Sequence, residues 1–307
     1  MAHDIVILGV FVADAAFRCT RLPRLGETLI GTGFALGPGG KGSNQAVAAA
    51  KAGGDVGFLA RIGTDTFGDM GMATWAAAGV TPLVIRDPDR ATGAAGIFIE
   101  ETEGRNAIVI SPGAAAAITV ADIEARADEI GAAKVAVTQL EQPVEVAERF
   151  LRRASEAGVT TVFNPAPAAA LPEGMLTLCD YVTPNEAEAE ALTGIAVTDH
   201  DSAAGAAAAL MAQGVRRGAI ITLGGDGALV LDAGGARHVP AMRAGPVVDT
   251  TGAGDAFNGG FACALAEGRG LDDALRFATA VAALSVTLPG TAASMPARAE
   301  VEALLAR

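Results

Sequence analysis

Two patterns of hydrophobic residues alternate along the chain, and together they predict its architecture. Residues 5–9 form an almost continuously apolar run, which is typical of a strand buried on both faces of a sheet. From about residue 119, short apolar runs alternate with stretches that repeat apolar residues at helical spacing. This alternation predicts an α/β fold with a mainly parallel central sheet flanked by helices. Ser43 or Asn44 can cap the helix predicted at 46–52. Strands are predicted at residues 5–9, 56–60, 134–140, 160–163, 181–183 and 218–223, and helices at 46–52, 65–78, 119–130, 143–157, 185–193 and 201–213.

A second, smaller sheet is predicted outside this alternation. Residues 15–37 carry Gly and Pro without a convincing helical period, so they indicate loops or short strands. Two β-like runs, 95–100 and 107–110, flank the polar residues 101–106 and predict a hairpin. We expect this hairpin and residues 11–36 to form a small separate sheet.

Polar side chains follow several of the predicted buried strands. Asp14, Glu141 and Asn164 come just after such strands, as do residues 184–188 and 222–227. Open α/β sheets bind their ligands outside the carboxyl ends of the strands, so these residues mark the expected ligand edge. Asp14 taken alone fits a solvated loop carboxylate better.

The stretch at residues 247–261 carries the clearest chemistry, because a helix is predicted to begin there near Gly252 or Ala253. Its first turn is almost free of side chains, so the N–H groups at the positive end of the helix are open to an anion such as a phosphoryl group. Asp255 lies in the same turn. A carboxylate repels an anion bound beside it, a cost that makes sense if the carboxylate takes a proton from an attacking hydroxyl. The G-x-G-D pattern alone fits an ordinary Gly-rich turn equally well.

A second glycine-rich run occupies residues 37–45. It matches G-x-G-x-x-G formally, but it is not the first strand-to-helix turn and Pro38 interrupts it, so we reject a dinucleotide site. Gly42 also stands where a Walker A motif requires Ser or Thr. A backbone without side chains allows a small polyhydroxylated ligand to approach closely, with Lys41 and Asn44 as hydrogen-bond donors.

Composition limits the classes of function. With 307 residues, 51% of them hydrophobic, and a mean hydropathy of +0.38, the chain can bury one large core, and we expect one domain over residues 1–307. The net charge of −13 argues against nucleic acid or an anionic membrane as partner, because both attract clustered Lys and Arg. Phosphates must then be bound locally by backbone N–H groups and cations, which implies a divalent metal ion carried with a nucleotide.

Cysteines, histidines and the N-terminus exclude further classes. The three cysteines have no C-x-x-C spacing, so we expect reduced thiols in a cytoplasmic protein. No signal peptide is recognisable at the N-terminus, and the weakly polar run at 277–288 is too short to span a bilayer. His3, His200 and His238 are isolated from one another in the sequence, which argues against a zinc site and against a Ser-His-Asp hydrolase.

Two signatures occur together in this chain. Residues 39–46 (G-G-K-G-S-N-Q-A) and 249–257 (D-T-T-G-A-G-D-A-F) resemble the paired signatures of the ribokinase, or PfkB, family of sugar kinases. The pairing is far more specific than either half. Four further segments are similar to the family in order and spacing, so the resemblance covers essentially the whole chain: residues 164–167, 183–188, 221–224 and 277–287.

The resemblance implies a large α/β domain with a small β-sheet lid, from roughly residues 11–36 and 92–113, that also forms a homodimer contact. The sugar is implied to lie between the lid and the sheet edge, with Asp255 as general base for its primary hydroxyl. The N–H groups of Gly252, Ala253 and Gly254 are the implied donors to the transferred phosphoryl group. The positions implied to line the sugar site are Val12, Asp14, Gly40, Lys41, Asn44, Glu141 and Asp255.

The resemblance also implies an ATP site, Mg²⁺ and a monovalent cation, usually K⁺. The implied nucleotide-binding positions are Asn185, Glu188, Thr222, Gly224, Gly225, Gly227, Gly254 and Thr279. The implied cation positions are Asp249, Thr251, Ser285, Leu288, Gly290 and Ser294, several of them through backbone carbonyls.

These observations predict an ATP-dependent kinase that phosphorylates the primary hydroxyl of a pentose, first of all ribose to ribose 5-phosphate. Within the same chemistry, the alternative is a kinase for another sugar, a deoxy sugar or a nucleoside. The alternative from another class is a catalytically silent sugar-binding protein. The intact Asp255 argues against silence, because folding requires no carboxylate beside an anion site.

One position departs from the family's pattern. Ribokinases typically carry Asn two residues before the residue that matches Asp14, and that Asn hydrogen-bonds a sugar hydroxyl; here the position is Val12. Valine can neither donate nor accept, so a hydroxyl directed at it loses its partner. One outcome is that the substrate lacks that hydroxyl or presents an apolar face there. A second is that ribose is the substrate and binds with a poorer KM. The third alternative is that water or a neighbouring side chain satisfies the hydroxyl.

Overall fold

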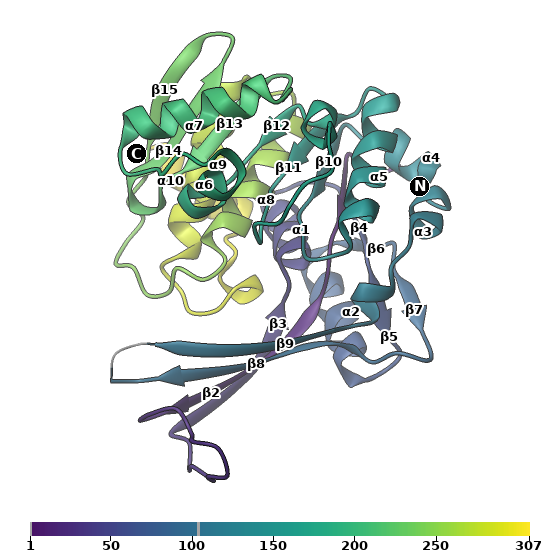
Figure 1. Ribbon diagram of the computed structural model, residues 1–307, viewed down its shortest axis with the longest axis vertical. Coiled ribbons are helices and arrows are strands. Elements are labelled where there is room, and N and C mark those ends of the chain that lie inside the picture. The colour runs from purple at the N-terminus through teal and green to yellow at the C-terminus, as the bar shows by residue number, and fades with distance from the viewer. Residues whose placement is uncertain (1, 103–104) are drawn as a thin grey trace.

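The computed structural model describes residues 2–102 and 105–307 as two main sheets and their covering helices (Figure 1). The central sheet has nine strands in the order β15-β14-β13-β12-β11-β10-β1-β4-β6. Neighbouring strands from β13 to β6 are parallel, whereas β14 and β15 at one edge are antiparallel. The predicted α/β class is therefore confirmed. The strands are β1 (Ile5–Leu8), β4 (Val56–Leu59), β6 (Thr81–Pro82), β10 (Val135–Thr138), β11 (Thr160–Phe163), β12 (Tyr181–Val182), β13 (Gly218–Thr222), β14 (Gly227–Asp232) and β15 (Gly235–Pro240).

Alternate side chains of the central strands face two different helix layers. In β1, Ile5 and Ile7 belong to a core formed with α1, α8 and α9, whereas Val6 and Leu8 belong to a core formed with α3, α4 and α5. Burial on both faces explains why this strand is continuously apolar. The first layer contains α1 (Lys41–Lys51), α2 (Thr66–Ala78), α8 (Ala253–Ala266), α9 (Leu271–Ser285) and α10 (Arg298–Leu305). The second layer contains α3 (Val120–Glu124), α4 (Ala127–Gly131), α5 (Val144–Glu156), α6 (Glu186–Thr193) and α7 (His200–Ala212).

The small sheet extends away from these layers, in the strand order β3-β2-β8-β9 (Figure 1). Its strands lie largely within the two ranges predicted from the sequence, and β8 and β9 pair as the predicted hairpin. Residues 103 and 104 of the predicted turn lie outside the described residues. Because β2 follows β1 closely along the chain, the small sheet is anchored at the carboxyl edge of the central sheet. Its strands are β2 (Val12–Cys19), β3 (Gly33–Gly39), β8 (Thr92–Glu100) and β9 (Asn106–Gly113), and two further short strands, β5 (Arg61–Gly63) and β7 (Ile85–Asp87), pair separately.

The predicted start of the first helix was wrong. Helix α1 begins at Lys41 with Gly40 as its N-cap, so neither Ser43 nor Asn44 caps it. Gly40 has a φ of +90°, a conformation that glycine adopts without the steric cost paid by other residues. The Ser43 hydroxyl instead accepts a hydrogen bond from Trp75 Nε1 at 2.9 Å.

Two further element predictions need correction. The helix predicted at 119–130 is two short helices, α3 and α4, which are interrupted at Arg126 (φ −117°, ψ 16°). The apolar residues keep their helical spacing across the break, so Ile123 of α3 and Ile130 of α4 enter the same core. Strands β14 and β15 and helix α10 were not predicted; β15 is an edge strand with partly exposed residues, and its sequence carries no clear alternation.

The cysteines and the long apolar stretches have plain structural roles. Cys19, Cys179 and Cys263 are buried free thiols. Most of the run at 277–288 belongs to α9, which packs against α8. Within residues 2–102 and 105–307, no helix combines the length and hydropathy that crossing a bilayer requires.

Candidate active site

The start of α8 has the bare first turn that the sequence predicts. Its N-cap, Gly252, has a φ of +79° and offers no capping side chain. The Ala253 N–H donates to the Thr250 carbonyl at 3.2 Å. The N–H groups of Gly254 and Asp255 have no acceptor among the described residues. The positive end of α8 is therefore available to an anion.

The Asp255 side chain is buried in this turn, with 6% of the residue exposed. Asn44 Nδ2 donates to its Oδ2 at 3.0 Å, and Gln45 Nε2 donates to its Oδ1 at 3.2 Å. Burial raises the pKa of Asp255 above its ordinary value, although the nearby charge of Lys41 and these two hydrogen bonds act against the rise. A carboxylate with a raised pKa and fixed orientation is suited to accept a proton near neutral pH.

Gln45 links Asp255 to further buried amides. Its Nε2 also donates to Asn164 Oδ1 at 3.2 Å, and its Oε1 accepts from Gln139 Nε2 at 2.6 Å. Both partners follow central strands, at the edge where ligands were expected. Gln45 is thus held between the sheet edge and the carboxylate of α8.

The hydrogen-bond chain then returns to α8. Asn164 Nδ2 donates to the Thr183 carbonyl at 3.0 Å, and Thr183 Oγ1 donates to Asn258 Oδ1 at 2.6 Å. Asn258 Nδ2 donates to the Gly254 carbonyl at 2.8 Å. One network therefore fixes Asp255 and its neighbour Gly254. No functional role was predicted for Gln45 or Asn258, although a polar residue in an apolar helical stretch was a visible signal.

A second group of acidic side chains lies beside Asp255. Glu141 Oε2 accepts a hydrogen bond from the Lys41 N–H at 2.7 Å. Burial raises the pKa of Glu141 to about 7, and the charges of Asp255 and Asp14 contribute to the rise. Burial also raises the pKa of Asp14 to about 6. Asp14, Lys41, Glu141 and Asp255, four of the predicted sugar-site positions, are therefore close enough for their charges to interact.

Asn44 has an unsatisfied polar atom at this place. Its Nδ2 donates to Asp255, while its buried Oδ1 has no hydrogen-bond partner among the described residues. Leaving a buried acceptor unpaired costs about 1–3 kcal/mol, so the site fits a ligand that brings a donor.

Val12 and Gly40 complete the predicted sugar positions. Val12 begins β2 and is 8% exposed. It shares a face of the small sheet with Asp14, because side chains two residues apart in a strand point the same way. The glycine run allows close approach to this face, since a Cβ built on Gly39 would lie 2.1 Å from Asp14 Oδ2.

Three of the predicted nucleotide positions already have partners within the chain. Asn185 caps α6: its Oδ1 accepts from the Glu188 N–H at 2.8 Å, and Glu188 Oε2 accepts from the Asn185 N–H at 2.9 Å. Burial raises the pKa of Glu188, and the charges of Lys41 and Asp255 act on the same carboxyl, so it lies near the candidate site. The Thr279 hydroxyl is buried in α9 and donates to a carbonyl of that helix at 2.8 Å. Its contact with the base stays a prediction.

The remaining nucleotide positions form the loop after β13. The Thr222 N–H donates to the Pro184 carbonyl at 2.9 Å, which holds this loop beside the start of α6. Gly224 and Gly227 have φ values of +53° and +106°. No atom lies within 4 Å of a Cβ built on Gly224 or Gly225, so the backbone of the loop is open to a ligand.

Asp249 joins the two loops that contain the predicted cation positions. Its Oδ1 accepts from the Thr251 N–H at 2.9 Å and its Oδ2 from the Gly290 N–H at 3.0 Å. Burial alone would raise the pKa of Asp249, but these hydrogen bonds outweigh it and lower the pKa below the ordinary value. The buried Ser285 and Ser294 hydroxyls donate to carbonyls at 2.9 and 2.8 Å, which leaves lone pairs on their oxygens. Carboxylate and hydroxyl oxygens are ligands that a hard cation accepts. The six positions are Asp249, Thr251, Ser285, Leu288, Gly290 and Ser294, of which Thr251, Leu288 and Gly290 are exposed.

Comparison with known proteins agrees with this geometry. Residues 2–298 match the family described as pfkB family carbohydrate kinase. A ribokinase of Haemophilus influenzae is 38% identical over 301 residues, which cover 98% of this chain and 97% of the relative. A deoxyribokinase of Salmonella typhi is 36% identical over 295 residues, 95% of each chain. The structure of Arabidopsis thaliana ribokinase complexed with ribose and ATP matches with a TM-score of 0.92 at 31% identity, covering 99% of both chains.

The raised pKa of Glu141 predicts a pH-dependent cost to stability. A carboxyl whose pKa rises from 4.5 to about 7 on folding stabilises the folded state at low pH, and this contribution is lost as the pH rises through that range. Glu141→Gln keeps an acceptor for the Lys41 N–H and cannot ionise. We expect its free energy of unfolding at pH 8 to exceed that of the wild type by about 1–3 kcal/mol.

Urea unfolding at pH 8 and at pH 4 measures this difference, which should disappear at the lower pH. The exposed Glu173→Gln serves as control and should show no difference at either pH. A Glu141→Gln protein that is less stable than the wild type at pH 8 would contradict the expectation that the ionised Glu141 carboxylate destabilises the fold at this pH.

Proposed function

Because this chain belongs to the PfkB family of carbohydrate kinases, we propose that it transfers the γ-phosphoryl group of ATP to the primary hydroxyl of a pentose, first of all ribose. The observation that carries this proposal is the buried Asp255 carboxylate in the same helical turn as the unpartnered N–H group of Gly254. The similar enzyme of Arabidopsis thaliana, solved with ribose and ATP, supports the choice of substrates.

Asp255 is the proposed general base. It takes the proton of the primary hydroxyl while the hydroxyl oxygen forms its bond to the γ-phosphorus and the bond to ADP breaks. Asn44 and Gln45 hold the carboxylate in one orientation during this step. The N–H groups of Gly252 and Gly254 donate to the transferred phosphoryl group, where charge develops. Ala253, the third proposed donor, gives up its bond to Thr250 to join them.

The remaining hydroxyls of the sugar bind to the group of residues beside Asp255. Asp14 and Glu141 accept hydrogen bonds from sugar hydroxyls. Gly40 and Lys41, at the start of α1, lie beside Glu141 and contact the sugar there. A hydroxyl that donates to Asn44 Oδ1 satisfies the buried acceptor that otherwise lacks a partner.

ATP is proposed to lie over the loop of residues 222–227, with its phosphates directed at the start of α8. Asn185 and Glu188 lie at the adjoining helix start, and their capping bonds leave one carboxylate oxygen of Glu188 for water or Mg²⁺. Bound Mg²⁺ neutralises charge on the phosphates. Asp249 and its neighbouring oxygens suit K⁺, which orders the turn that follows Thr251.

The small sheet is also proposed to pair with that of a second copy of the chain. Phe17, Phe34 and Val109 are 42%, 60% and 70% exposed, and strand register places them on one face of the sheet. Ile108 and Ile110, 50% and 59% exposed, lie on the face of Asp14. One bound sugar cannot cover both apolar faces, so a second sheet is the expected cover.

Release of ADP from ATP and Mg²⁺, in the presence of a panel of sugars and nucleosides, tests the proposed function. We expect release with ribose or a closely related pentose, and phosphate on the primary hydroxyl of the product. Binding of sugars without any release would instead support a catalytically silent sugar-binding protein.

Replacing the proposed base should reduce catalysis and spare binding. We expect Asp255→Asn to lower turnover by roughly 10²- to 10⁴-fold, the usual contribution of a positioned general base. Calorimetric affinities for sugar and ATP should stay close to those of the wild type, because Asn is similar in size to Asp. Near wild-type turnover of this variant would exclude Asp255 as the base.

Activity should depend on K⁺ if Asp249 and its neighbours hold the cation. At constant ionic strength, replacing choline by K⁺ should raise kcat, and Na⁺, which is smaller, should substitute poorly. Asp249→Asn should weaken this dependence. Equal rates in the three cations would argue against the site.

Val12 suggests a substrate without one hydroxyl, and the similarity to a deoxyribokinase favours 2-deoxyribose as the second candidate. Val12→Asn restores a hydrogen-bonding side chain. We expect it to raise kcat/KM for ribose relative to 2-deoxyribose by roughly 5- to 150-fold, the value of one buried hydrogen-bond partner.

Val12→Ala is the control for packing, because it removes methyl groups and adds no polar atom. It should not change the preference between the two sugars. If Val12→Asn lowers activity on every sugar, the side chain serves packing alone.

A further inference from the structure

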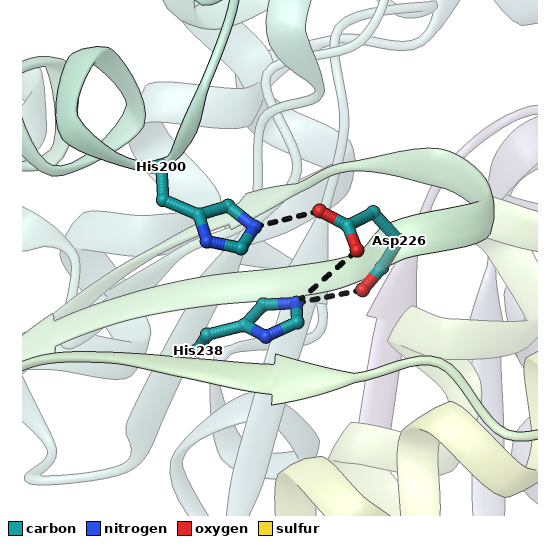
Figure 2. A group of neighbouring side chains, drawn as sticks. All are labelled: His200, Asp226 and His238. Carbon is teal, nitrogen blue, oxygen red and sulfur yellow. Dashed lines mark hydrogen bonds and ion pairs between the residues drawn. The ribbon is translucent and has the colours of Figure 1, made fainter.

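Two histidines and an aspartate meet at the loop after β13 (Figure 2). His200 is the first residue of α7, Asp226 ends the turn at 224–226, and His238 lies in β15. His200 Nε2 lies 2.6 Å from Asp226 Oδ2, and His238 Nε2 lies 2.7 Å from the Asp226 carbonyl and 3.8 Å from its Oδ1. The centroids of the two imidazole rings are 4.2 Å apart. The histidines that looked isolated in the sequence are therefore neighbours, because α7 and β15 both flank this loop.

The three side chains offer ligand atoms that all lie within 4.8 Å of one another. No other group of His, Cys, Asp and Glu has this geometry in the part of the chain that the structure describes. The side chains of His200, Asp226 and His238 are 46%, 60% and 28% exposed, so an ion can reach them from solvent.

We propose that His200, Asp226 and His238 bind a divalent transition-metal ion of the Zn²⁺ class. Two imidazole nitrogens and one carboxylate oxygen are ligands that Zn²⁺, Co²⁺ and Ni²⁺ accept, with water in the open positions. Mg²⁺ prefers oxygen ligands, so this site is distinct from the one expected for the metal ion of the nucleotide.

Small movements suffice to form the site. Ligand bonds of about 2.0–2.1 Å place neighbouring ligand atoms roughly 3.3 Å apart in a tetrahedron. The 3.8 Å between His238 Nε2 and Asp226 Oδ1 therefore has to shorten by about half an ångström, and the 2.6 Å between His200 Nε2 and Asp226 Oδ2 has to lengthen by about 0.7 Å. Each imidazole carries its proton on Nδ1 when Nε2 binds the ion, so the hydrogen bonds to Asp226 are exchanged for metal bonds.

An ion at this place joins three segments of the chain. It connects the start of α7, the turn at 224–226 and β15 by metal bonds, in place of the exposed hydrogen bonds that His200 and His238 make to Asp226. Because the ion prefers the folded chain, it stabilises the fold by an amount that grows with the logarithm of its concentration once this exceeds the Kd. Its binding does not depend on the proposed kinase activity.

Titration of the tag-free, chelator-treated protein with Zn²⁺ and with Co²⁺, without nucleotide, tests the site. We expect one equivalent of Zn²⁺ by calorimetry, visible absorption bands of Co²⁺ that Zn²⁺ abolishes, and a higher melting temperature with Zn²⁺. His200→Asn and His238→Asn should each weaken binding at least about 10-fold, and Asp226→Asn should do the same.

His3→Asn is the matched control, since His3 lies apart from the cluster and pairs with Asp55. It should bind Zn²⁺ like the wild type. The double variant His200→Asn/His238→Asn keeps His3 and the three buried cysteines, so it measures binding elsewhere. Wild-type binding no tighter than that of the folded double variant would overturn the proposal.

Discussion

A carboxylate buried at the positive end of a helix needs fixed partners, and the site described here depends on those of Asp255. Gln45 reaches this carboxylate because α1 and α8 pack very closely. A Cβ built on Gly259 of α8 would lie 2.6 Å from both the Gln45 carbonyl and the Ala48 methyl group. The contact therefore tolerates no side chain on Gly259, and it places Asn44 and Gln45 against Asp255. Close packing of two helices thus fixes the orientation of the proposed base.

The same constraint extends to the edge of the central sheet. Asn164 and Thr183 follow two parallel strands and complete the network that ends at Gly254. The strands therefore supply more than a core, because their carboxyl ends orient the turn that receives the phosphoryl group. The small sheet brings Asp14, a residue of β2, to this edge. Its strand β3 is joined to the loop of residues 286–291 by a hydrogen bond of 2.9 Å, which the Thr291 hydroxyl donates to the Pro38 carbonyl.

Much of this arrangement could be predicted from the sequence where the signal is local. The start of α8, the role of Gly252 and the position of Asp255 all follow from one short stretch. The start of α1 was misplaced, because Gly40 caps it through backbone conformation and not through a side chain. The partners of Gln45 and the meeting of His200 with His238 join residues far apart in the chain, and no periodicity encodes such contacts.

The pH dependence of kcat/KM in Gln45→Leu tests most directly whether the buried Asp255 takes the substrate's proton while Gln45 helps to keep it charged. In the free enzyme this dependence reports the pKa of the essential base. Loss of one hydrogen bond to the carboxylate favours its neutral form, so the acidic limb should move to higher pH in Gln45→Leu than in the wild type. The comparison is made in the Glu141→Gln background, which removes the carboxyl whose pKa is raised to about 7, while Asp14 is the same in both proteins. An acidic limb that does not move would contradict the account.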